Sequence, residues 1–396
     1  MRRSRLLALA LTLATWWARP AAAWGPYTHV AIGREALEAV EASPRSPLRF
    51  LLTEPCRTLF LAGSMGADMT FSVNSFGKDN RAFDRLLHNP ELCRRQVQSA
   101  VQARDAGQLA IALGWYSHIL ADRVMRQPGG VIYRNVFELD AATQKAVGGD
   151  VAELNKIAID AILARENPRI LTTMPRFELD LLARSLRATG GTELPATDAA
   201  LRERLNGYVA SFTSATVSLR EICRSLAANN RAFPELASAL SETTEGRPEQ
   251  VPGIAASARV ICSRLAPLVP EDLAANGSGI RPPPPPAALG FWDRVTSSLT
   301  RRSRSALQGD GLGSRALRGF LDGCLRAMNA LGLARESTRR ARLMATFLGE
   351  MVSGKRDWEG VKAVVRAAMR PAKGGKDTSD PADALSPDEA PLDGAP

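Results

Sequence analysis

Apolar residues recur at three- and four-residue spacing along much of the chain, and no stretch alternates strictly between apolar and polar positions as a half-buried strand does. A segment over Leu48–Ala62 is also apolar, but it is interrupted at Pro55 and ended by Gly63. The spacing predicts further helices over residues 30–42, 90–104, 108–124, 150–165, 174–188, 196–226 and 230–241. We therefore expect an all-α fold.

Abrupt changes in Pro, Gly and charge content divide the chain into segments. Five consecutive prolines at 282–286 favour an extended, stiff spacer, and the Pro-, Gly- and Asp-rich end of the chain favours disorder. We expect a signal peptide over residues 1–23 and a helical body over 24–275. These are followed by a Gly/Pro-rich linker over 276–286, a small helical unit over 287–370 and a disordered acidic tail over 371–396.

The beginning of the chain has the pattern of an export signal. Three arginines among the first five residues precede the short apolar stretch Leu6–Trp17, and small residues follow at Ala21–Ala23. We expect cleavage after Ala23, a mature chain that begins at Trp24, and a secreted or periplasmic location. The apolar stretch is too short to span a bilayer, and no later run is long enough, so we expect no transmembrane segment in the mature chain.

Composition agrees with a helical, basic protein. Aromatic residues make up 6% of the chain and hydrophobic residues 45%, which suits a helical core better than a large β-sandwich. There are 51 Lys and Arg against 41 Asp and Glu, a net charge of +10. This charge favours anionic partners such as phosphate esters, anionic lipid or nucleic acid; the alternative is a set of Arg-rich solvated helix faces.

An exported chain with five cysteines is a candidate for disulfides. No two of them have the spacing of a metal-binding pair. We expect Cys56–Cys93 and Cys223–Cys262 as bridges, with Cys324 left over.

The candidate chemistry lies among the three histidines of the chain, His29, His88 and His118. His118 and Asp122 stand four residues apart on a predicted helix, so both side chains lie on one face and can bind one metal ion. The alternative is a His–Asp pair that fixes a contact between helices. Asp68 lies in a glycine-flanked segment predicted to be a loop, where it can point into a cleft or act as a turn residue.

These residues carry a resemblance to a known family. The segments Trp24–His29, Gly63–Asp68 and Leu113–Asp122, together with His88, resemble the bacterial zinc-dependent phospholipase C family and, more distantly, the fungal zinc-dependent single-strand nucleases. The likeness covers about residues 24–140. It implies an all-helical body that holds a cluster of zinc ions, followed here by a C-terminal helical extension.

The resemblance implies a ligand for each position of a bridged zinc pair. In the family one zinc is bound by the amine and carbonyl of the N-terminal Trp with a His and an Asp, here Trp24, His29 and Asp122. The second zinc shares this Asp and takes three further ligands, here Asp68, His88 and His118.

The chain departs from the family at the third zinc. The family has a His shortly after the bridging Asp, where Gln127 or Pro128 stands here, and then a His four residues before a Glu. The last two positions are Arg134 and Glu138, so that Glu138 alone remains as a metal ligand. The Arg134 guanidinium is suited to hold a phosphate oxygen in place of the third metal; the alternative is a decayed site.

The resemblance implies phosphodiester hydrolysis, with Asp68 orienting or deprotonating the attacking water and Arg134 stabilising negative charge on the phosphoryl group. A phospholipid, reached by peripheral contact with a membrane, is the first substrate expected, and single-stranded nucleic acid is the second. The alternative from another class is a non-catalytic interaction module that is stabilised by its metal.

Overall fold

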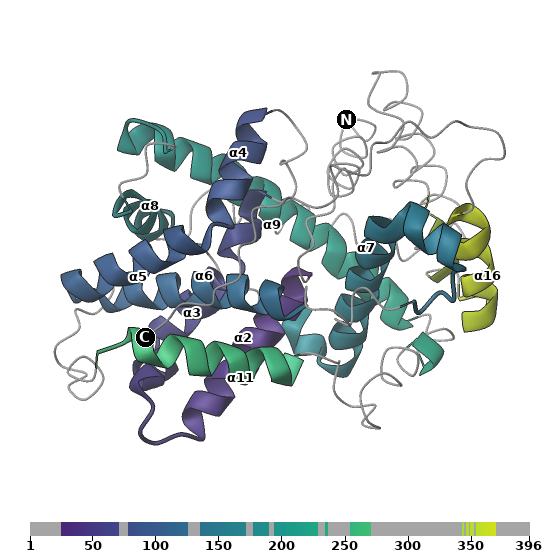
Figure 1. The fold of residues 1–396 in the computed structure, drawn as a ribbon, viewed down its shortest axis with the longest axis horizontal. Helices are drawn as coiled ribbons and strands as arrows, with labels where there is room; N and C mark the ends of the chain where they lie inside the picture. The colour runs from purple at the N-terminus through teal and green to yellow at the C-terminus, as the bar shows by residue number, and fades with distance from the viewer. Residues whose placement is uncertain are drawn as a thin grey trace.

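The fold is all-α, as predicted. The computed structural model describes residues 25–70, 78–125, 135–171, 177–189, 194–228, 234–236, 254–270, 343, 346–347, 349–351 and 354–369 (Figure 1). Within these residues 81% are helical and none is in a strand. The expected signal peptide, linker and acidic tail, as well as Cys324, lie outside the described residues.

The longer described helices are α2 (Pro26–Glu41), α3 (Cys56–Gly63), α4 (Lys78–Leu87), α5 (Pro90–Ala103), α6 (Ala106–Met125), α7 (Ala141–Glu166), α8 (Leu179–Arg187), α9 (Asp198–Ala228), α11 (Ile254–Leu265) and α16 (Trp358–Met369). Short 3-10 turns are η1 (Pro47–Leu52), η2 (Gly66–Thr70), η4 (Pro168–Leu171) and η5 (Ala266–Leu268). Among the described helices, none is both long and apolar enough to cross a membrane.

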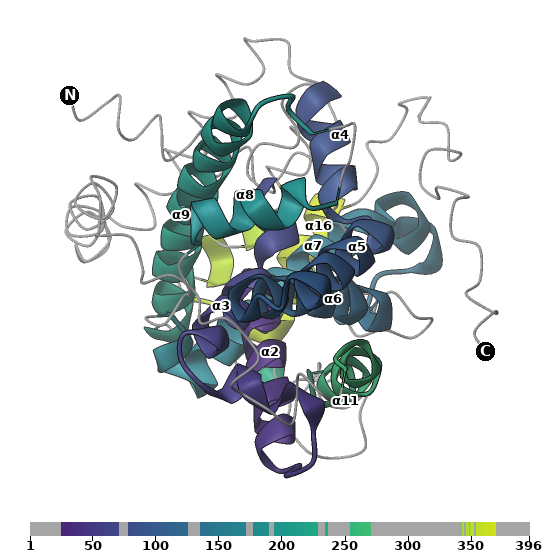
Figure 2. The same cartoon turned by 90° about the vertical axis from the view of Figure 1, so that its left-hand side faces the viewer.

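Helix α6 is the centre of the body. It packs against α3, α5, α11, α8, α2 and η2, and Figure 2 shows it enclosed by these elements. Its residues from Leu109 to Asp122 are buried with little interruption, which explains why the helix is apolar around its whole circumference rather than along one stripe. A polar side chain on α6 is therefore held inside the protein, away from bulk water.

Helices α3 and α6 cross at very short range through two glycines. A Cβ atom on Gly114 would lie 2.1 Å from the carbonyl oxygen of Phe60, and one on Gly63 would lie 2.3 Å from that of Ile111. Only residues without a side chain allow the two backbones to approach so closely. This crossing fixes where α6 lies relative to the chain that follows α3.

Several helix boundaries differ from the prediction for identifiable reasons. Helix α2 begins at Pro26, because proline at the first helical position replaces an amide that would have no partner. Helix α7 begins at Ala141, where Asp140 accepts a hydrogen bond from the Thr143 amide at 2.9 Å. The segment around Asp68, predicted to be a loop, is the 3-10 turn η2.

The described part of the C-terminal region packs on the chain between α6 and α7. Phe137 contacts Phe347 and Trp358, with ring centroids 5.8 and 5.5 Å apart. Lys362 on α16 pairs with Glu138. These contacts attach α16 to the same hydrophobic core as the first helices.

The expected disulfides are wrong. Cys56, Cys93, Cys223 and Cys262 are all free thiols. Cys56 on α3 and Cys93 on α5 lie on separate helices that each pack against α6, and the Cys262 thiol is directed at the Ala36 carbonyl oxygen, 3.4 Å away. Burial raises the pKa of Cys56 to about 11, so this thiol is protonated and unreactive at neutral pH.

Candidate metal centre

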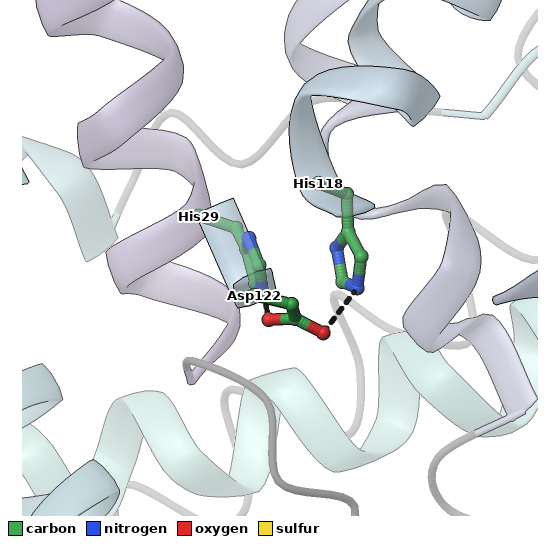
Figure 3. Close-up of side chains that lie close together, drawn as sticks. All are labelled: His29, His118 and Asp122. Atoms are coloured by element: carbon green, nitrogen blue, oxygen red, sulfur yellow. Dashed lines mark ion pairs between the residues drawn. The ribbon is translucent and has the colours of Figure 1, made fainter. Parts of the chain in front are cut away.

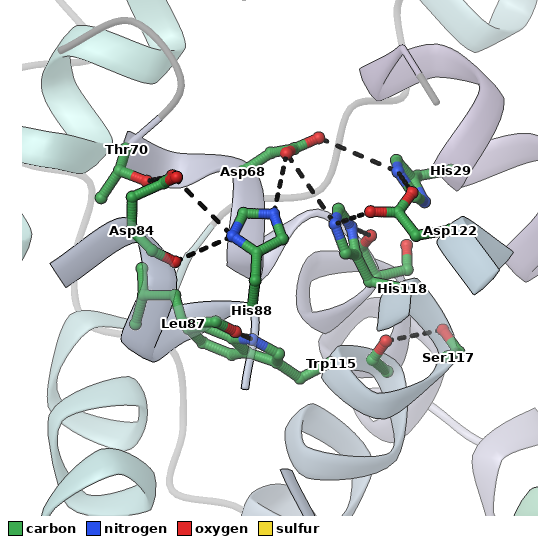
Figure 4. Close-up of polar contacts among 12 residues, drawn as sticks. His29, Asp68, Thr70, Asp84, Leu87, His88, Trp115, Ser117, His118 and Asp122 are labelled. Atoms are coloured by element: carbon green, nitrogen blue, oxygen red, sulfur yellow. Dashed lines mark hydrogen bonds and ion pairs between the residues drawn. The ribbon is translucent and has the colours of Figure 1, made fainter. Parts of the chain in front are cut away.

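Five polar side chains from four parts of the chain meet in the interior beside α6 (Figure 4). His29 comes from α2, Asp68 from η2, and His88 from the turn between α4 and α5, while His118 and Asp122 come from adjacent turns of α6. The four apart from His88 are at most 3% exposed. The structure thus brings together five of the predicted metal ligands.

Each carboxylate of the group turns its two oxygens toward different histidines. Asp122 Oδ1 lies 3.4 Å from His29 Nε2, and Asp122 Oδ2 lies 3.5 Å from His118 Nε2 (Figure 3). Asp68 Oδ2 lies 3.9 Å from His29 Nε2, and Asp68 Oδ1 lies 3.8 Å from His118 Nε2. Asp68 Oδ1 is also 3.6 Å from His88 Nε2. Both carboxylates therefore have the orientation of a bridge between a His29 side and a His88–His118 side.

Backbone carbonyls orient two of the imidazoles. His118 Nδ1 lies 2.9 Å from the Ser64 carbonyl oxygen, and His88 Nδ1 lies 2.9 Å from that of Asp84. A carbonyl can only accept, so each Nδ1 carries the proton and each Nε2 carries the lone pair of the neutral ring. This is the arrangement in which a histidine binds a metal through Nε2.

Further hydrogen bonds hold the turn that carries His88. The Trp115 indole N–H on α6 donates to the Leu87 carbonyl oxygen at 2.8 Å. The Thr70 hydroxyl at the end of η2 donates to the Asp84 carboxylate. Both bonds connect α4 to the elements that carry the other side chains of the group, so the position of His88 is set by tertiary contacts.

The two buried carboxylates and the three imidazoles shift one another's pKa values. Burial opposes ionisation of the carboxylates, but the adjacent histidines, with His118 foremost, together outweigh it: they lower the pKa of Asp68 and hold that of Asp122 well below its usual range. Burial lowers the pKa of His29. At His88 the contacts with Asp68 and Asp84 and the charge of Asp122 together outweigh burial and raise the pKa to about 9. The pKa of His118 is raised by Asp68 and Asp122. Without a metal, a proton on His88 compensates part of the negative charge of the carboxylates, and the raised pKa of His118 favours a second proton there.

The donor atoms fit a metal ion of the zinc type. Among the described residues, Nε2 of His29, His88 and His118 and Oδ1 of Asp68 are buried without a hydrogen bond of normal geometry. Ligand atoms within 4.8 Å of one another form two groups, His29–His118–Asp122 and Asp68–His88–His118. Imidazole nitrogen and carboxylate oxygen are the donors that zinc takes. His118 belongs to both groups but has one lone pair at Nε2, so it binds one ion at a time.

The remaining predicted site residues lie elsewhere or outside the described chain. Trp24 and Arg134 are not among the described residues. Glu138 belongs to neither ligand group: its side chain is 59% exposed, and its carboxylate pairs with Lys362 and with Arg366, the latter at 3.4 Å. Its backbone has φ of 52°, so the chain turns there in the left-handed region. The prediction of Glu138 as a metal ligand is therefore not supported by its position.

Two contributors to the group were missed at the level of sequence. Asp84 approaches His88 Nδ1 with its carboxylate, at 3.8 Å, as well as with its backbone carbonyl. Ser64 supplies a backbone oxygen to His118. The spacing of four between Asp84 and His88 was a usable signal, whereas a backbone carbonyl has none.

No protein family, curated protein or solved structure matches the chain significantly.

Proposed function

We propose that the protein is an exported zinc-dependent phosphodiester hydrolase of the phospholipase C type, with a bridged two-zinc centre. The observation that carries the proposal is the convergence of three imidazole Nε2 atoms and two carboxylates in two overlapping ligand groups. The apolar stretch after the first arginines supports export, and the order of the motifs supports the phosphodiesterase class.

We divide the ligands between two ions as the resemblance implies, with His118 on the side of His88 and the amine and carbonyl of Trp24 on the side of His29. His88, His118, Asp68 Oδ1 and Asp122 Oδ2 would hold one ion, while His29, Asp122 Oδ1 and Asp68 Oδ2 face the position of the other. Bound zinc supplies a water of lowered pKa and a Lewis acid for the phosphoryl oxygens.

The protein residues provide orientation and proton acceptance. Asp68 is buried and ionised, and it stands between the two histidine sides, so its carboxylate can accept the hydrogen bond of an attacking water. The carbonyls of Ser64 and Asp84 keep His118 and His88 in the metal-binding tautomer. Arg134 remains a proposed phosphate-binding residue.

A second candidate is a non-catalytic module that is stabilised by its metal. The position of Glu138 favours it, because the last acidic residue expected for a third metal is engaged by Lys362 and Arg366 instead. On this proposal the metal pair contributes only to stability, and α16 belongs to the interaction surface.

Turnover of model diesters separates the two candidates. The zinc-loaded mature chain is expected to release p-nitrophenol from p-nitrophenyl phosphorylcholine, to lose this activity on chelation, and to regain it with added zinc. Preferential cleavage of single-stranded DNA would instead favour the nuclease alternative, which the basic charge suits. Tightly held metal without turnover of either diester would favour the non-catalytic module.

Zinc binding is expected to displace protons. The pKa of His88 is raised to about 9, so this ring carries a proton at pH 7 that must leave before Nε2 binds a metal, and the raised pKa of His118 acts in the same direction. Loading should therefore release about one proton per chain from His88 at pH 7. Because a raised pKa strengthens proton competition below that pKa, zinc affinity should increase as pH rises toward about 9.

Calorimetry at one pH in buffers of different ionisation enthalpy measures this release directly. His88→Ala should release one proton fewer than the wild type. A heat of binding that does not depend on the buffer would contradict the protonated, charge-compensated state of the metal-free group.

A further inference from the structure

Helix α2, which presents His29, lacks an N-terminal cap from its own sequence. Its first residue, Pro26, follows Gly25, which has no side chain to accept a hydrogen bond from the first turn. The first amides of a helix have no partner within the helix and need an external acceptor. In this buried helix start, an amide left without an acceptor would be costly.

Asp160, which is remote in sequence, supplies that acceptor from α7. Its Oδ1 accepts hydrogen bonds from the Thr28 amide at 3.0 Å and the Thr28 hydroxyl at 2.7 Å. The Asp160 carboxylate is fully buried, and its negative charge or dipole lies at the positive end of α2. It thus acts as a cap that is 132 positions away in sequence.

Gly25 brings the backbone against the same carboxylate. A Cβ atom at position 25 would lie 2.3 Å from Asp160 Oδ2, so no other residue fits without displacing Asp160 or the chain. The carbonyl of Gly25 in turn accepts the His29 amide at 3.1 Å. The carboxylate therefore fixes the helix start on both sides of Pro26, one turn before His29.

We propose that Asp160 is a positioning residue for the His29 side of the metal centre. It holds the first turn of α2 so that the His29 ring stacks on His118, with ring centroids 3.8 Å apart, and Nε2 faces Asp122 Oδ1 at 3.4 Å. This inference rests on the proposed function, since it assigns Asp160 to one of the two metal positions. The His88 side is attached to α4 and α6 and does not depend on the start of α2.

Cobalt titration separates the two positions without relying on activity. Wild-type protein is expected to bind two Co²⁺ ions with distinct absorption changes, and His29→Ala and His88→Ala assign each change to one side. Asp160→Ala should weaken binding at the His29 side about tenfold or more, as loss of an outer partner of a ligand does, and leave the His88 side unchanged.

Two variants provide the matched controls. Asp160→Asn keeps an acceptor oxygen and the shape of the side chain, so it should restore near-wild-type binding. A neutral side chain suits this position because burial raises the pKa of Asp160 to about 7, although the bonds from Thr28 lower it. Asp140 accepts the same pair of bonds from Thr143 at the exposed start of α7, so Asp140→Ala removes an equivalent cap and should leave both cobalt positions intact.

The outcomes distinguish the inference from the proposed function. If Asp160→Ala weakens both positions equally, or neither, the positioning role is wrong while the metal centre stands. If wild-type protein binds no cobalt, both fail. If Asp160→Ala does not fold, Thr28→Val removes the hydroxyl bond alone and is expected to weaken cobalt binding at the His29 side selectively. A Thr28→Val variant whose cobalt affinity changes equally at both positions, or at neither, would overturn the positioning role.

Discussion

Asp122→Asn is expected to remove both metal ions, with the dissociation constant of each raised about 100-fold or more. Asp122 turns one oxygen toward His29 and the other toward His118, so a single change affects both sides. The amide keeps the shape of the side chain but replaces a charged oxygen by an NH₂ donor that repels a cation. Metal content after dialysis, measured by atomic emission, gives the result.

Asp105→Asn provides the matched control on the same helix. Asp105 accepts a hydrogen bond from the Gln108 amide at 2.9 Å at the start of α6, and Asn caps a helix as well as Asp. This variant should keep both ions. Loss of only one ion in Asp122→Asn would show that the carboxylate does not bridge.

Gly114→Ala is expected to lower the free energy of unfolding by about 2 kcal/mol or more and to weaken metal binding as well. The added methyl group would meet the backbone of Phe60, 2.1 Å from its carbonyl oxygen, and a backbone cannot move aside as a flexible side chain can. Separation of α3 from α6 would also move Ser64 away from His118. Urea denaturation of the metal-free and zinc-loaded protein measures both effects.

The same substitution at Gly207 tests whether the effect comes from the crossing. Gly207 lies exposed within α9, and a Cβ atom there would have no atom within 4 Å among the described residues. Alanine is the better helix former, so Gly207→Ala should raise stability by up to about 1 kcal/mol. Equal changes in stability at positions 114 and 207 would contradict the close packing of α3 on α6.

Regular spacing allowed part of the fold and site to be predicted. The helix that carries His118 and Asp122 follows from a long run of apolar, helix-forming residues, and the placement of both side chains on one face follows from their spacing of four. The start of α5 follows from Asn89, which accepts a hydrogen bond from the Glu91 amide. These features depend on residues close together in sequence.

Features set by tertiary packing could not be predicted in this way. Helix α4 is short and polar overall, and among its described side chains only Phe83, Leu86 and Leu87 are buried, so its apolar face consists of few residues. The Gly148–Gly149 pair favours a break, yet α7 continues through it.

The sequence also could not place Glu138 or Asp160. Glu138 lies at a left-handed backbone turn and pairs with a helix more than 200 positions later. The cap that Asp160 provides joins α7 to α2, and no local pattern marks it. Their roles depend on how the helices pack together, which only the folded chain specifies.

Anomalous diffraction at the zinc absorption edge, from crystals of the zinc-loaded mature chain, tests the central claim most directly. The account predicts two peaks: one bound by Nε2 of His88 and of His118, the other by Nε2 of His29, at about 2.0–2.1 Å from each nitrogen, with Asp122 between them. The absence of a peak among these five side chains, or zinc bound only elsewhere on the chain, would contradict it.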